Sequence, residues 1–208
     1  MSLFNSDLNN EQILGQYLDE IYRKINIPLE RVIDKDLQHK GVDIIYQSKP
    51  NPVYIDEKAQ LHYINSKLST FTFELSYLKD NMQKVGWLLD KEKITQYYFL
   101  VTGIFVNKGD ELTSGVKKCK ITSVNRSKLI QLLKQKGLNP LTLELYNQKI
   151  RNDSDSKYKT EINELNIKTE GCIVYSEQLV EKPINIMLKL NFLIQQGVAK
   201  QIYPKICL

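Results

Sequence analysis

Two short segments near residue 50 have the alternating pattern of apolar and polar side chains that is typical of β-strands. They are residues 41–46 and 53–60, and β-branched and aromatic residues dominate both. Residues 47–52 between them are rich in Pro and other turn formers, so we expect a hairpin. Successive side chains of a strand point to opposite faces. Four side chains of the second strand are therefore expected on one face: Tyr54, Asp56, Lys58 and Gln60.

The remaining pattern predicts an α/β protein. Alternating or continuous apolar runs predict further strands over residues 69–77, 95–106, 116–124 and, at a sheet edge, 172–176. Apolar residues at helical spacing predict helices over residues 9–27, 127–136 and 141–150. Residues 183–194 fit a strand or a helix with Pro183 in its first turn, and we favour the helix. Residues 29–40 follow neither period and are expected to be irregular, and residues 79–84 are expected to form a turn.

Composition adds the expectation of one globular domain over residues 1–208. A chain of 208 residues, 42% hydrophobic and 25% charged, buries a substantial core, and no linker divides it. It contains no apolar run long enough for a transmembrane helix, and the polar N-terminus does not resemble a secretion signal. The three widely spaced cysteines fit neither a disulfide framework nor a four-ligand zinc site. The expected location is the cytoplasm, without a membrane partner.

The net charge of the chain excludes few classes of function. The formal net charge of +5 is compatible with binding nucleic acid. Residues 107–136 hold a local excess of lysine, including Lys117, Lys118 and Lys120, which fits either a surface that neutralises DNA phosphates or a solvated face. Glycine-rich phosphate loops are absent from the sequence, so an ATPase or a nicotinamide enzyme is unsupported.

The predicted hairpin carries the side chains that a divalent metal site needs. Asp43 and Asp56 can supply two carboxylates to Mg²⁺, or to Mn²⁺ in its place, if the register of the hairpin brings them together. Lys58 can orient a water or offset charge on a phosphate, and Gln60 continues the same face. The alternative is an exposed strand face whose Asp and Lys form a weak charge pair. The same Asp-x-Lys spacing recurs at Asp155 in a polar loop, so the triplet alone says little.

In this context the residues resemble a known superfamily. Glu20, residues 36–43 and residues 55–60 together look like the restriction-endonuclease-like superfamily of PD-(D/E)XK nucleases, over about residues 10–106. The resemblance implies a helix followed by a mixed central sheet flanked by helices, with a C-terminal elaboration over about residues 107–208. Its motif has Val42 where Pro is usual, and Asp56 where Glu is commoner.

The resemblance also implies roles for individual residues. Asp43 and Asp56 correspond to the two metal-binding acids, and Lys58 corresponds to the motif lysine. The backbone carbonyl of Glu57 would join the metal shell, and Glu20 matches an accessory acid on the first helix. Asp43, Asp56, Lys58 and Gln60 are therefore the predicted catalytic residues.

These expectations lead to three hypotheses about function. The first is a Mg²⁺-dependent DNA endonuclease of restriction or repair type that hydrolyses phosphodiester bonds by metal-activated water; such enzymes are often dimers, which is compatible with a homodimer. The second is a non-catalytic module with the same fold that binds nucleic acid or protein. The third is an unrelated protein with an accidental motif, in which Asp43 and Asp56 would lie far apart.

Overall fold

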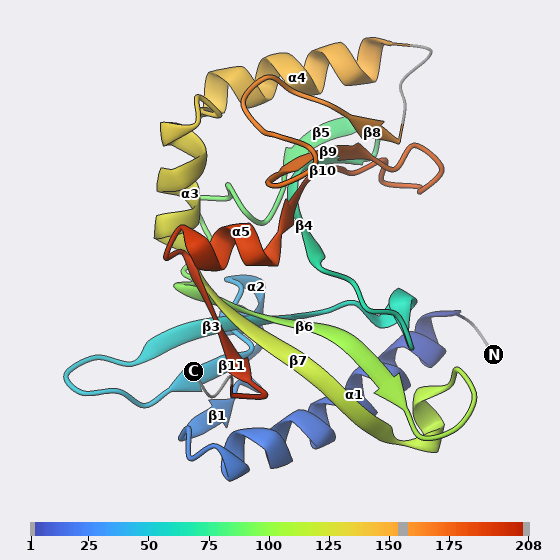
Figure 1. Cartoon of the computed structure of the whole chain (residues 1–208), viewed down its shortest axis with the longest axis vertical. Helices are drawn as coiled ribbons and strands as arrows, with labels where there is room; N and C mark the ends of the chain where they lie inside the picture. The colour runs from blue at the N-terminus through green and yellow to red at the C-terminus, as the bar shows by residue number, and fades with distance from the viewer. Residues whose placement is uncertain (1–2, 154–157, 206–208) are drawn as a thin grey trace. The chain divides into compact units, whose positions relative to one another are not determined.

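A computed structural model of the chain describes residues 3–153 and 158–205, and for residues 3–8 it describes the backbone only. The chain forms two compact units. The first consists of residues 1–68, 95–123 and 200–208, and the second of residues 69–94 and 124–199. The chain therefore leaves the first unit and returns to it twice, which differs from the predicted boundary near residue 107. Figure 1 labels most of the elements that follow.

A six-stranded sheet forms the first unit (Figure 1). Its strands, in spatial order, are β1 (Leu29–Arg31), β2 (Ile44–Tyr46), β3 (Val53–Ala59), β6 (Tyr97–Val106), β7 (Val116–Asn125) and β11 (Ala199–Tyr203). The predicted hairpin is confirmed, because β2 and β3 pair antiparallel. The predicted central strand is also confirmed as β6, which pairs parallel to β3. The sheet is therefore mixed, as expected.

Helix α1 (Leu3–Lys24) contributes an apolar stripe to the core of this unit. Leu14, Leu18 and Ile21 recur at helical spacing and are buried with Ile44 and Ile55 of the hairpin. The helix begins at Leu3, so the predicted start near residue 9 is wrong. These residues determine which side of α1 is buried. Because they pack on Ile44 and Ile55, α1 covers one face of the six-stranded sheet.

The segment that was expected to be irregular contains two short elements. Strand β1 pairs antiparallel with β2, and helix α2 (Lys35–His39) follows it. The Asp34 carboxylate caps α2 by accepting the backbone N–H groups of Asp36 and Leu37. The prediction of an irregular segment is wrong because elements of three and five residues are too short to show a period.

The second unit contains a five-stranded sheet. Its spatial order is β5 (Met82–Val85), β4 (Thr70–Lys79), β10 (Ile184–Lys189), β9 (Gly171–Tyr175) and β8 (Lys159–Thr160), and all neighbours pair antiparallel. The strand predicted over residues 69–77 is confirmed as β4. Strand β5 occupies part of the segment expected to be a turn.

Two predictions for this sheet are wrong. Residues 183–194 form strand β10 followed by the short helix α5 (Leu190–Gln195), instead of one helix. Ile184, Ile186 and Leu188 are buried alternately along β10, and two neighbouring strands satisfy its backbone. Strand β9 lies between β10 and β8, so it is not an edge strand, and all five of its residues are buried.

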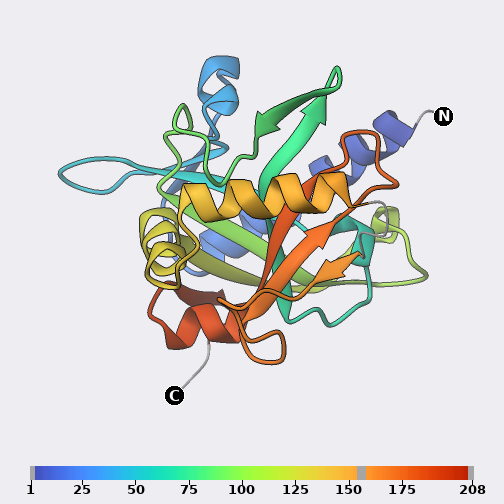
Figure 2. The same cartoon turned by 90° about the horizontal axis from the view of Figure 1, so that it is seen from above.

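Helices α3 (Arg126–Gln135) and α4 (Pro140–Asn152) confirm two sequence predictions. Asn125 and Asn139 cap them by accepting backbone N–H groups of their first turns. Figure 2 shows α4 lying along one face of the five-stranded sheet. Two 3₁₀ helices, η1 (Leu61–Tyr63) and η2 (Leu112–Ser114), complete the described elements. Across residues 3–153 and 158–205, each helix is too short or too polar to span a bilayer.

The alternating burial of β10 predicts unequal effects of substitution. Ile186→Ala should lower the free energy of unfolding by about 2–5 kcal/mol, because it leaves a cavity at a fully buried position. Asn185→Ala, at the neighbouring half-buried position, should lower it by less than about 1 kcal/mol. Urea unfolding of both variants measures the difference. Equal losses would contradict the strand.

Candidate functional site

The register of the hairpin places Asp43 beside Asp56. Ile44 pairs with Ile55, and the Asp43 N–H donates to the Ile55 carbonyl at 2.9 Å. The Asp43 Oδ2 atom accepts the backbone N–H of Glu57, also at 2.9 Å. Asp43 therefore lies across from Asp56, and the two side chains are close enough to share a hydrogen bond. The hypothesis of an accidental motif required these carboxylates to lie far apart, and it does not describe this arrangement.

Asp56 is almost completely buried, with only 3% of its surface exposed. Its Oδ1 atom forms an ion pair with Lys58 Nζ at 2.9 Å. Burial raises the pKa of Asp56 from 3.8 to about 7; the Lys58 ammonium opposes this rise, and the Asp43 carboxylate adds to it. The Asp56 carboxyl group therefore titrates near neutral pH, which is unusual for an aspartate.

The two faces of β3 carry different chemistry. Ile55 lies in the core formed with α1, and Glu57 contacts Tyr22 of the same helix. Because side chains alternate along a strand, Asp56 and Lys58 lie on the opposite face. Gln60 continues that face at the point where β3 ends, and its backbone N–H donates to the Val101 carbonyl of β6 at 3.0 Å. The structure thus brings Asp43, Asp56 and Lys58 together, with Gln60 next along the strand.

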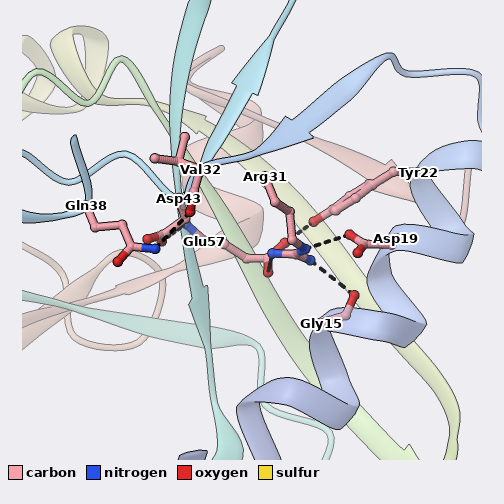
Figure 3. A network of polar contacts seen from close by, with 8 residues as sticks. All are labelled: Gly15, Asp19, Tyr22, Arg31, Val32, Gln38, Asp43 and Glu57. Carbon is pink, nitrogen blue, oxygen red and sulfur yellow. Dashed lines mark hydrogen bonds and ion pairs between the residues drawn. The ribbon is translucent and has the colours of Figure 1, made fainter. Parts of the chain in front are cut away.

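Glu57 has a structural role through its side chain (Figure 3). Its carboxylate accepts the Tyr22 hydroxyl and one Arg31 nitrogen, the latter at 3.2 Å. Arg31 also donates to Asp19 Oδ1 at 2.7 Å and to the Gly15 carbonyl at 3.1 Å. Burial raises the pKa of Glu57, and Arg31 opposes that rise. The network ties α1, β1 and β3 together, so it fixes the strand that carries Asp56 and Lys58.

A cavity of about 500 Å³ lies in the first unit next to these residues. Its polar lining comes from Glu11, Arg31, Gln38, Asp43, Glu57 and Lys58. The Gln38 amide that borders it is held by a 2.8 Å hydrogen bond to the Val32 carbonyl, as Figure 3 shows. Its position between α1 and the hairpin makes it the candidate place for a ligand of the first unit.

The acid of α1 that lines this cavity is Glu11, which the sequence analysis did not select. Glu20 is exposed, lies 3.9 Å from Lys24 as an ion pair along the helix, and does not line the cavity. Helical spacing provides a signal for Glu11, because Glu11, Leu14 and Leu18 recur three and four residues apart on one face.

The carboxylates set limits on the kind of metal site that can form here. Within the part of the chain that the structure describes, there is no group of three or more His, Cys, Asp or Glu side chains placed to hold a metal ion. An ion between Asp43 and Asp56 would therefore depend on two carboxylates, with water and a backbone carbonyl such as that of Glu57 as further ligands. Mg²⁺ accepts such a set, because it is commonly bound by one or two carboxylates and keeps several waters.

Comparison of the chain with protein-family models, with curated proteins and with solved structures gives no match.

The Arg31 network predicts a loss of stability when its cation is removed. Arg31→Met should lower the free energy of unfolding by about 2–3 kcal/mol, because it leaves the Glu57 carboxylate buried without its ion pair. We expect less than the 3–5 kcal/mol typical of fully buried pairs, since the Arg31 side chain is 35% exposed. Chemical unfolding measures the change. Arg23→Met, at an exposed arginine of the neighbouring helix α1, is the matched control and should change stability by less than about 0.5 kcal/mol.

The raised pKa of Asp56 predicts how stability depends on pH in the absence of metal. Between about pH 4 and pH 7 the folded chain holds a proton on Asp56 that the unfolded chain has lost, so stability falls as pH rises through this range. A rise from 3.8 to about 7 corresponds to roughly 4 kcal/mol. Asp56→Asn should remove most of this fall and be more stable than the unmodified protein at pH 8. Urea midpoints at several pH values in EDTA test this, and parallel pH profiles for the two proteins would contradict it.

Proposed function

We propose that this protein is a metal-dependent endonuclease that hydrolyses phosphodiester bonds in DNA, with Asp43, Asp56 and Lys58 as its catalytic residues. The observation that carries the proposal is the pair of adjacent carboxylates, Asp43 directly before β2 and Asp56 on β3, with the Lys58 ammonium 2.9 Å from Asp56. Two acids and a lysine in this arrangement are suited to an ion, a water and a phosphate.

The order of elements in the first unit supports the same proposal. Helix α1 precedes β1, β2 and β3, which pair antiparallel in sequence order, and β6 then pairs parallel to β3. A helix followed by a mixed four-stranded sheet is what the restriction-endonuclease-like resemblance implies. The connection from β3 to β6 differs from a simple helical crossover, because it contains η1 and strands β4 and β5 of the second unit.

The residues of the site have separate roles in this proposal. Asp43 and Asp56 would hold Mg²⁺, or Mn²⁺, together with the Glu57 carbonyl. When bound, such an ion lowers the pKa of a water and polarises a phosphoryl oxygen. Lys58 would place its ammonium next to the phosphate and offset the negative charge that develops there. Gln60, one step further along the face, would orient the water or a substrate oxygen.

A non-catalytic binding module is the second candidate, and one observation favours it. Asp56 is 3% exposed and already paired with Lys58, so the pair can instead be a structural feature of the hairpin. In that case the chain would bind DNA equally well with EDTA or Mg²⁺ and would not cut it.

Substitution of the three residues tests the nuclease proposal. Asp43→Asn, Asp56→Asn and Lys58→Met should each reduce cleavage of plasmid DNA in Mg²⁺ or Mn²⁺ by at least about 100-fold, because each removes a ligand or a charge at the reacting phosphate. EDTA should abolish cleavage by the unmodified protein. Gel assays of plasmid relaxation and linearisation measure these rates.

Lys157→Met is the matched control. Asp155 and Lys157 repeat the Asp-x-Lys spacing, and both lie outside the described residues. This variant should cut at the unmodified rate. Circular dichroism establishes that each variant is folded, and cleavage that survives in a folded Asp56→Asn variant would overturn the proposal.

A further inference from the structure

The face of the six-stranded sheet that carries Asp56 and Lys58 extends to two lysines of β7. Cys119 and Ile121 are buried in the core with α1. Side chains alternate along β7, so Lys118 and Lys120 point to the other face of the sheet. That is the face occupied by Asp56 and Lys58 on β3, two strands away in the same unit.

Strand β6 joins these two groups across the sheet. Asp56 pairs with Tyr98, so the side chains of Tyr98 and Asp56 share a face. Phe99 and Val101 lie in the α1 core, and so do Ile104 and Val106. The residues of β6 that face α1 therefore change from odd-numbered to even-numbered positions at Gly103. The φ of +56° at Gly103 shows a local irregularity in the strand. Phe105 is thereby returned to the face of Asp56.

The two lysines are held over this part of β6. The Lys118 ammonium lies 4.5 Å from the centroid of the Phe105 ring, which is the geometry of a cation–π contact. A Cβ atom at Gly103 would lie 4.0 Å from Lys120 Cγ. Both lysines are exposed, and among residues 3–153 and 158–205 neither forms an ion pair. Their charges are therefore available to an anionic partner.

We propose that Phe105, Lys118 and Lys120 form a binding surface for the phosphate backbone of the DNA that is cut at Asp43 and Asp56. This inference rests on the proposed function and identifies how the substrate is held. Lys118 and Lys120 lie five to seven residues along β6 from the partner of Asp56, and two strand spacings across the sheet. At about 3.3 Å per residue and about 4.8 Å per strand, the separation is roughly 20 Å. The lysines would contact phosphates about six base pairs from the cut.

Binding of a duplex DNA in EDTA tests this surface independently of catalysis. Each phosphate contact contributes about 0.9 to the slope of log affinity against log salt concentration. The double variant Lys118→Gln/Lys120→Gln should therefore lower the slope by about 1.8. The same relation predicts about fivefold weaker binding per lysine at 0.15 M salt, or about 30-fold for both.

Lys117→Gln is the control, because it removes the same charge from the adjacent position of β7. Lys117 lies on the face of Cys119, where its carbonyl accepts the Tyr17 hydroxyl at 3.4 Å. This variant should leave the slope of log affinity against log salt concentration unchanged. Its affinity for DNA should stay within twofold of that of the unmodified protein. Equal losses from Lys117→Gln and from Lys118→Gln would overturn the proposal, because they would show a general effect of net charge.

The assay separates failure of this surface from failure of the proposed function. DNA cleavage in Mg²⁺ together with unchanged binding by the double variant would overturn the surface and leave the nuclease proposal in place. If the double variant weakens DNA binding, Lys117→Gln does not, and the unmodified protein cuts no DNA in Mg²⁺, the binding surface is supported and the nuclease proposal is overturned. The absence of DNA binding by the unmodified protein in EDTA at low salt would overturn the surface directly.

Discussion

The register between β2 and β3 is the constraint on which the rest of the candidate site depends. A slip of one residue would turn Asp43 to the other face of the sheet and separate it from Asp56. Two features prevent that slip. Ile44 and Ile55 must stay together beneath α1, and the Asp43 carboxylate accepts the Glu57 N–H at 2.9 Å. Asp43 therefore holds the register that brings its own carboxylate to Asp56.

Asp56 and Glu57 are adjacent on β3 but face opposite sides of the sheet. Glu57 is buried towards α1, where Arg31 and Tyr22 satisfy its carboxylate and tie the strand to its neighbours. Asp56 is buried on the opposite face beside a second acid, with Lys58 as its cation. Burial raises the pKa of Asp56, and the Lys58 ammonium offsets that rise only in part. A group left in that state destabilises the metal-free fold and is suited to bind a cation.

The sequence predicts the parts of this structure that have a clear period and misses the short or ambiguous ones. Alternation identified the hairpin and its polar face, and the continuous apolar run identified β6. Strand β10 was predicted as a helix because Pro183 suits a first helical turn, whereas pairing with β4 and β9 determines the outcome. Such pairing is tertiary and leaves little local signal. Glu20 was selected because it matches an accessory acid in the resemblance, whereas the helical stripe through Leu14 and Leu18 indicates that Glu11 is the acid of α1 beside the hairpin.

The candidate catalytic residues of β3 and two lysines of β7 lie on one face of the six-stranded sheet. The α1 face of the sheet carries the apolar core, and its Glu57 carboxylate is paired with Arg31. On the other face lie the ion pair of Asp56 and Lys58 and the exposed cations of Lys118 and Lys120. The irregularity at Gly103 is what allows this, because an uninterrupted alternation along β6 would turn Phe105 towards α1 and remove the ring beneath Lys118. A single glycine in β6 therefore decides whether the cations of β7 stand over an aromatic ring on the face that carries the acids.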